Sequence, residues 1–141
     1  MPTRTTTWPR TLLVALFCLL CLAPTLAEDD AKQPEEKPKT VSLVIDYNDG
    51  AQIRFPAIPW KEDFTALNAL EFAADHPHGI TFKSRGSGET ALLYRIDDLE
   101  NQGGSGLNWI FKVDGKLGDR SFAITPLKPG DRILWKFDEY R

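Results

Sequence analysis

The stretch GLNWIFKVDGKLGDRSF, residues 106–122, has the strongest local folding signal in the chain. Trp109 and Phe111 stand at alternate positions, with smaller or charged residues between them, which is the two-residue period of a strand with one buried face. Asp114-Gly115 then interrupts the run, and an Asp-Gly pair between alternating apolar residues is typical of a two-residue hairpin turn. The stretch therefore predicts an antiparallel hairpin with large aromatic side chains.

Other segments have the composition of strands. Apolar and β-branched runs bounded by turn residues predict strands at residues 41–47, 51–58, 80–82, 91–96 and 132–137. The first two are joined by Asn48-Asp49-Gly50, whose residues tolerate positive φ, so they are expected to form a second hairpin. In the last of these strands, at 132–137, alternate positions place Ile133, Trp135 and Phe137 on one face.

Residues 63–75 change to a helical period. Apolar residues recur at spacings of three and four at Phe64, Leu67, Leu70 and Ala74. Asp63 is the expected N-cap of this helix, with Thr65 as the alternative, and Pro77 and Gly79 are expected to follow its end. A helix with a single apolar stripe must pack on another element, and the face of a sheet is the available one.

The order strand, strand, helix, then further strands predicts an α+β fold, in which one helix packs on one face of a mixed sheet. This order is that of the β-grasp fold, whose first and last strands lie side by side at the centre of the sheet. Residues 41–141 are long enough for one such domain, and about 100 residues is a common domain size.

The first 27 residues have the pattern of a secretory signal peptide. Arg4 and Arg10 precede an apolar run at 11–22, and small residues lead to an expected cleavage after Ala27. We therefore expect export to a periplasm or to the outside of the cell. An uncleaved anchor is the alternative, although the run is shorter than the about 20 apolar residues of a membrane-spanning helix. Lipidation at Cys21 fits less well, because Leu20 before it is not small.

Residues 28–40, EDDAKQPEEKPKT, are polar, charged and interrupted by proline, which predicts a disordered linker. Both cysteines, Cys18 and Cys21, lie in the apolar run, so a chain cleaved after Ala27 would have neither a disulfide nor a cysteine metal ligand. Two of the 17 basic residues and none of the 20 acidic ones precede Glu28, which gives a net charge of −5 after cleavage. This charge argues against nucleic acid and anionic membranes as partners.

Three segments resemble the C-terminal domain of transcobalamin and intrinsic factor, and a family of bacterial secreted domains of unknown function similar to it. They are FTALNALEFAAD (64–75), WIFKVDG (109–115) and LKPGDRILWKF (127–137). The resemblance implies a β-grasp domain that binds a soluble ligand, such as a cobalamin-type corrinoid. The ligand contacts that it implies are Leu92, Leu93, Tyr94, Asn108, Trp109, Leu117 and Gly118.

Several of these residues also have a purely structural interpretation. Phe111, Trp135 and Phe137 are expected in the core, because a domain without disulfides depends on each buried ring, whereas Trp109 fits the core and a ligand contact equally. His76 and His78, beside Asp75, are expected in a polar loop rather than at a metal.

Residues 97–100, DDLE, are expected in a solvated loop rather than at a calcium ion, because they lack the alternating oxygen ligands of an EF-hand. Neither GSG nor GGSG matches a nucleophile elbow or a phosphate-binding loop. We therefore expect a monomeric, non-enzymatic binding module without a resident cofactor or metal. Its partner would be a small soluble ligand or, alternatively, another envelope protein that pairs with an exposed sheet edge. An enzyme is the least favoured interpretation.

Overall fold

The computed structural model describes residues 39–140. The predicted signal peptide, residues 1–27, and residues 28–38 of the predicted linker lie outside the described residues. Thr40, the last residue of that linker as predicted, is the first residue of a strand.

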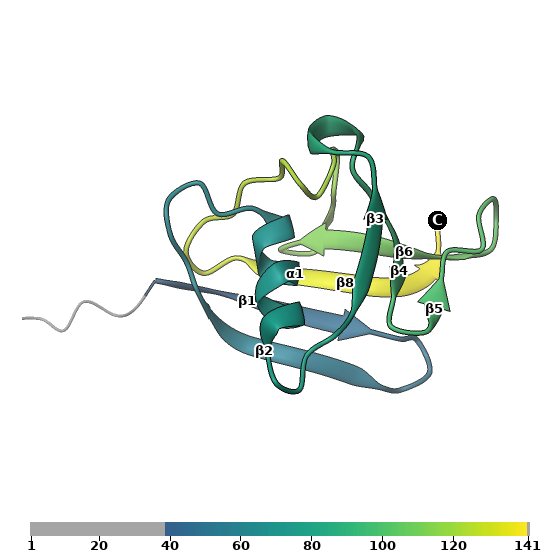
Figure 1. Ribbon diagram of the computed structural model, residues 1–141, viewed down its shortest axis with the longest axis horizontal. Helices are drawn as coiled ribbons and strands as arrows, with labels where there is room; N and C mark the ends of the chain where they lie inside the picture. Colours follow the sequence, from purple (N-terminus) through teal and green to yellow (C-terminus); the bar gives the residue numbers. More distant parts are fainter. Residues whose placement is uncertain (1–38, 141) are drawn as a thin grey trace, which may run out of the picture. The chain divides into compact units, whose positions relative to one another are not determined.

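Strands make up most of the regular structure, with one short helix between them (Figure 1). The elements, in chain order, are β1 (Thr40–Asp46), β2 (Gln52–Pro59), α1 (Ala66–Asp75), β3 (Phe82–Arg85), the 3-10 turn η1 (Gly88–Thr90), β4 (Leu92–Ile96), β5 (Leu99–Glu100), β6 (Leu107–Val113), β7 (Lys116–Leu117) and β8 (Arg132–Glu139). Within residues 39–140, no helix has the length and apolar character that crossing a membrane requires.

The larger sheet has five strands in the order β2-β1-β8-β6-β7. β1 and β8 pair in parallel at its centre, with Ile45 beside Trp135, and the other pairs are antiparallel. This confirms the predicted adjacency of the first and last strands. Both predicted hairpins are also present: β1 pairs with β2, and β6 pairs with β7 around Asp114-Gly115.

The predicted α+β class, a β-grasp-like mixed sheet with one helix on one face, is wrong. The described chain is mainly β: it has eight strands in two separate sheets and one α-helix of 10 residues. The second sheet contains β3, β4 and β5 in that order, and part of it lies at Leu99–Glu100, where a solvated loop was expected. Much of the core is therefore closed by this second sheet, and the helix covers only part of the larger one.

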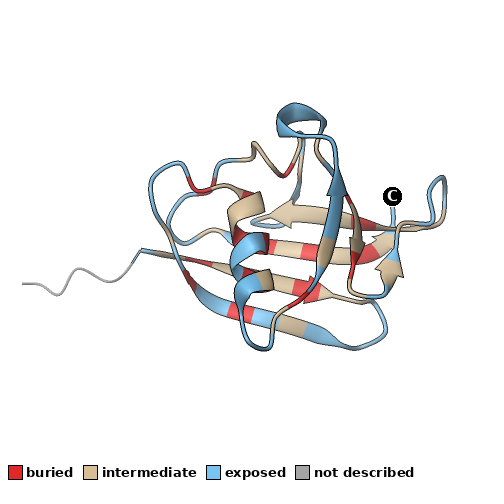
Figure 2. Cartoon of the chain, in the orientation of Figure 1, coloured by how far each residue is buried: buried red, intermediate tan, exposed pale blue. Residues whose placement is uncertain are grey.

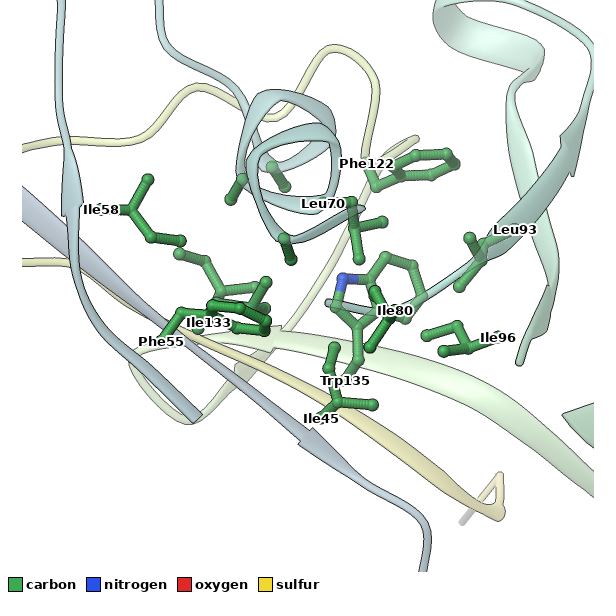
Figure 3. Close-up of a cluster of buried hydrophobic side chains, with 14 of the residues drawn as sticks. Ile45, Phe55, Ile58, Leu70, Ile80, Leu93, Ile96, Phe122, Ile133 and Trp135 are labelled. Carbon is green, nitrogen blue, oxygen red and sulfur yellow. The ribbon is translucent and has the colours of Figure 1, made fainter. Parts of the chain in front are cut away.

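The core lies between the five-stranded sheet, α1 and the second sheet, and Figure 2 marks buried residues on all three. Alternation along β1 and β8 points Leu43, Ile45, Ile133 and Trp135 to the core, and each of them is almost fully buried. Figure 3 places Trp135 in the middle of the core, near Leu70 of the helix and between Ile58 and Leu93. Trp135 and Phe137 are buried as predicted, whereas Phe111 is only half-buried at the edge of the core.

The helix begins later than the favoured prediction, because Thr65 and not Asp63 is its N-cap. The Thr65 hydroxyl accepts a hydrogen bond from the Asn68 amide, and the Asn68 side chain accepts one from the Thr65 amide. Asp63 has a positive φ of 60° in a turn that is closed by a bond from the Phe64 amide to the Lys61 carbonyl. Three small residues, Ala66, Ala69 and Ala73, then bring the helix close to the sheet.

Candidate functional site

A cavity of about 420 Å³ opens between the two sheets, where β4, β6 and the loop at 118–122 meet. Its walls come from four distant parts of the chain. The lining residues are Glu89, Thr90, Ala91, Leu92, Leu93, Trp109, Phe111, Gly118, Asp119, Arg120, Ser121, Phe122 and Trp135. A volume of this size falls within the range of small-molecule sites.

Aromatic rings form one side of the cavity. The ring centroids of Phe111 and Trp135 are 5.0 Å apart with a 33° angle between the ring planes, and Phe122 meets Trp135 edge-on at 5.6 Å. Trp109 is 6% exposed, and its indole N–H donates a hydrogen bond of 3.0 Å to the Leu99 carbonyl of the second sheet. These contacts fix the rings, so the apolar surface of the cavity is preformed.

Asn101 does not line the cavity, but it joins β4 to β6 at one end of it through two lining residues, Leu93 and Trp109. Its side-chain amide donates to the Leu93 carbonyl at 3.0 Å, and its side-chain oxygen accepts from the Trp109 amide at 2.8 Å. The Asn101 backbone amide also donates to the Tyr94 carbonyl at 2.8 Å. Both groups of one carboxamide are thus used to hold the two sheets together at this end.

The loop at 118–122 closes the other end. The Ser121 hydroxyl donates to the Ala91 carbonyl, just before β4, at 2.9 Å. The Phe122 carbonyl accepts from the Leu67 amide in the first helical turn at 3.1 Å, which satisfies a helix N–H that has no partner within the helix. The loop is therefore tied to both the second sheet and the helix.

Gly118 stands where the β6–β7 pairing ends, and it packs directly against the Phe111 ring. Its amide donates to the Phe111 carbonyl at 3.0 Å. A Cβ atom added at this position would overlap the Phe111 ring atoms. Glycine is thus required here by the close approach of the ring.

The rim of the cavity is polar and exposed. Glu89, Asp119 and Arg120 lie at its mouth, and Arg120 Nε donates to Asp119 Oδ1 at 3.1 Å. This hydrogen bond, together with the charge of Arg120, lowers the pKa of the Asp119 carboxyl. The mouth also has the Glu89 carboxylate and the hydroxyl oxygens of Thr90 and Ser121, whose protons are already donated to the Ser87 and Ala91 carbonyls. This mixture suits a ligand with an apolar body and a polar edge.

The structure brings together four of the seven residues predicted to contact a ligand: Leu92, Leu93, Trp109 and Gly118 line the cavity. Tyr94 does not line it, although its carbonyl bonds Asn101. Asn108 instead shapes the glycine-rich turn, since its side chain accepts from the Gly103 amide and donates to the Gly106 carbonyl. Leu117 pairs with Lys112 and so lies on the opposite face of the sheet from Phe111.

Sequence reasoning did not identify Asp97 as a structural residue. Its carboxylate accepts hydrogen bonds from the Tyr47 hydroxyl at 2.5 Å and from the Thr81 amide at 2.7 Å. The residue type was the local clue in the sequence, because Asp tolerates the positive φ of 47° that the structure shows at this turn. Asn101, Ser121 and Phe122 were also missed, since nothing local in the sequence indicates their partners.

A second hollow of about 390 Å³ lies beside β2 and the end of α1, and its lining includes Phe55, Phe72, His76 and His78. His76 meets Phe55 edge-on at 5.5 Å, and its Nδ1 accepts from the His78 amide at 3.2 Å. Over the described range 39–140, no three His, Cys, Asp or Glu side chains gather closely enough to hold a metal ion.

The fold of this chain is similar to the crystal structure of a "putative metal binding protein" from Ruminococcus gnavus ATCC 29149, with a TM-score of 0.56 and 14% identity. The similarity covers 73% of this chain and 99% of that one, and at this identity it establishes the fold alone. No curated protein matches the chain.

A family model extends from the turn before α1 to the end of β8, and so includes every wall of the cavity. The match covers residues 63–139, which is more than half of the 141 residues, but omits the β1–β2 hairpin. The chain therefore belongs to the family described as Domain of unknown function (DUF4430).

Proposed function

We propose that this protein is an exported, non-enzymatic binding module that holds a small soluble ligand in the cavity between β4, β6 and the loop at 118–122. The observation that carries this proposal is the preformed aromatic wall, in which Trp109, Phe111 and Trp135 are already held by their neighbours. A site whose rings are fixed before binding loses less conformational entropy when a ligand enters.

The preferred ligand is flat and largely apolar, with polar groups at one edge that meet the hydroxyls and charges of the rim. A cobalamin-type corrinoid is the specific candidate suggested by the resemblance to the transcobalamin and intrinsic factor domain. A cavity of about 420 Å³ would cover only one part of so large a ring system, so this domain would close over one side of it. The name of the Ruminococcus gnavus protein suggests a metal ion as a competing ligand.

Calorimetric titration of the purified protein with cyanocobalamin tests the corrinoid candidate, and titration with Zn²⁺ alone tests the metal. Leu92 lines the cavity and is 45% exposed, so Leu92→Ala removes apolar contact with little effect on folding. Leu117 is 42% exposed and lies outside the cavity, which makes Leu117→Ala its matched control. We expect Leu92→Ala to weaken corrinoid binding about fivefold, because about 1 kcal/mol of apolar contact is lost, and the control to bind as wild type does.

If titration with millimolar cyanocobalamin releases no heat, the corrinoid is excluded as the ligand. If Leu92→Ala and Leu117→Ala weaken corrinoid binding equally, the cavity is excluded as its site. If Zn²⁺ alone releases heat that Leu92→Ala does not change, the protein binds the metal outside the cavity.

Pairing with an envelope protein along a sheet edge is the second candidate. β3 ends the smaller sheet, and its residues from Lys83 to Arg85 are exposed. The outer strand β2 is less suited, since Pro56 and Pro59 lack the amide hydrogen that an added strand would need. A Ser84→Pro variant should abolish such pairing. Ser84 pairs with Leu93, which lines the cavity, so unchanged cyanocobalamin binding by this variant is the control that β4 is undisturbed.

A further inference from the structure

The face of the five-stranded sheet turned away from α1 and the three-stranded sheet forms a separate surface, here called the outer face (Figure 1). Alternation along the strands assigns side chains to it. Ile45 and Trp135 point to the core, so their neighbours Val44 and Leu134 point to the outer face, where they are half-buried. None of the walls of the ligand cavity belongs to this face.

A row of paired residues crosses the outer face from one edge strand to the other. Arg54 pairs with Val44, Val44 with Leu134, Leu134 with Lys112, and Lys112 with Leu117. Adjacent strands are about 4.8 Å apart, so the row spans roughly 19 Å. Its middle is aliphatic, its two cations stand on either side of that middle, and Leu117 at one end is 42% exposed.

The two strand carboxylates on this face are already satisfied within the chain, and the Asp114 carboxylate in the adjoining turn accepts from the Arg132 amide at 3.0 Å. The Asp46 carboxylate accepts from the Asn48 amide at 2.9 Å and from Gln52 Nε2 at 2.8 Å. The Asp138 carboxylate forms an ion pair with Lys136 at 2.8 Å.

The other cations have no such neutralising partner. Among residues 39–140, no carboxylate forms an ion pair with the side chains of Arg54, Lys112 or Arg132. Arg54 donates only to the neutral Gln52 side chain. Within the strands, the outer face has four cations and two carboxylates, and with the Asp114 carboxylate in the adjoining turn it is still net positive, while the whole chain has a net charge of −3. This asymmetry favours an anionic partner.

We propose that the outer face docks an acidic protein surface, with the partner's carboxylates on Arg54, Lys112 and Arg132 and its apolar side chains on Val44, Leu134 and Leu117. A protein fits better than a lipid surface, because Val44 and Leu134 are half-buried between Arg54 and Lys112 and expose little apolar surface to an acyl layer. The inference is independent of the ligand cavity, since the two sites use opposite faces of the sheet.

Amide shifts in an NMR titration of the ¹⁵N-labelled protein test this surface with two probes, poly-L-glutamate and a random copolymer of glutamate and tyrosine. At low salt we expect shifts at Val44, Lys112 and Leu134, and about tenfold weaker binding at high salt. The copolymer should bind more tightly than poly-L-glutamate, because it adds apolar contact, and Leu117→Ser should reduce that difference.

A combined Arg54→Gln, Lys112→Gln and Arg132→Gln variant should weaken binding of both probes about tenfold. The matched control removes three exposed cations outside the outer face by Lys83→Gln, Arg85→Gln and Lys128→Gln, and should bind as wild type does. Equal weakening by the control, or shifts away from the outer face, would overturn the proposal. Tighter binding of phosphatidylglycerol vesicles than of the copolymer at the same amides would assign the face to a membrane instead.

Discussion

The hydroxyl of Tyr47, after the end of β1, donates a hydrogen bond of 2.5 Å to the carboxylate of Asp97, which lies 50 positions further along the chain. The other carboxylate oxygen accepts from the Thr81 amide at 2.7 Å, and the Tyr47 ring meets Trp109 edge-on at 5.6 Å. One carboxylate thus joins the larger sheet to the turn between β4 and β5, next to a ring of the ligand cavity.

Replacement of Tyr47 by Phe should destabilise the domain by about 1.5 kcal/mol, because a hydrogen bond to a charged acceptor is lost while the ring remains. The midpoint of urea unfolding measures this change. Tyr140 is 68% exposed, so Tyr140→Phe is the control and should leave the midpoint unchanged. Equal midpoints for wild type and Tyr47→Phe would mean that the bond contributes nothing to folding.

Stability should also fall in alkali through Tyr47. Burial, together with the hydrogen bond to Asp97, raises the pKa of Tyr47 well above its usual value. Above pH 10 the unfolded chain loses the phenol proton while the folded chain retains it, so the unfolded state binds fewer protons and stability decreases as pH rises. Urea midpoints between pH 9 and about 11.5 should decline more steeply for wild type than for Tyr47→Phe, and parallel declines would contradict this origin.

A methyl group at Gly118 should disturb both the fold and the cavity. The Cβ of Gly118→Ala would overlap Phe111 and push its ring away from Trp135, at a cost of about 1–3 kcal/mol. Near-ultraviolet circular dichroism would report the altered aromatic packing, and urea unfolding the lost stability. Leu117→Ala, one residue earlier on an exposed side chain, is the control. An unchanged aromatic spectrum in Gly118→Ala would show that the ring can adjust without cost.

Removal of the Asn101 side chain should loosen the end of the cavity where β4 and β6 meet. Asn101→Ala leaves the Trp109 amide and the Leu93 carbonyl without their partner, and should cost about 1–3 kcal/mol. Hydrogen exchange of the Trp109 amide should become faster relative to amides of β1. Ser105→Ala, in the exposed turn that follows, should not alter this ratio. Unchanged protection of Trp109 would contradict the role of Asn101.

Local signals in the sequence were sufficient for the hairpins and for the existence of the helix. The two-residue period at Trp109 and Phe111, followed by Asp114-Gly115, predicted β6 and its turn correctly, because both depend on neighbouring residues. The start of the helix was harder to predict. The capping box of Thr65 and Asn68 is a local signal, but Asp63 offered a competing one. The first two helix amides, on Ala66 and Leu67, donate to the carbonyls of Thr125 and Phe122, which are 59 and 55 positions away, and no local pattern reports such partners.

Local sequence signals were not sufficient to predict the second sheet or most of the cavity. β3 and β5 have four and two residues, too few for a periodic pattern to distinguish a strand from a loop. The aromatic wall was predictable as a set of core residues. The contact of this wall with Ser121 and Phe122 was not predictable, because it depends on the path of the loop between β7 and β8. Bonds to the helix and to Ala91 before β4 determine that path.

The parallel pairing of β1 with β8 has a consequence for how the chain acquires its structure. The central partner of β1 is about 90 positions away, so in a chain that emerges from its N-terminus β1 has only β2 beside it until β8 has also emerged. During that interval the apolar edge and face of β1 remain open to wrong partners, and the closing of so long a loop makes folding slow. A holdase chaperone that shields Leu43 and Ile45 until β8 has emerged should therefore raise the yield of folded protein more than one that acts on the complete chain.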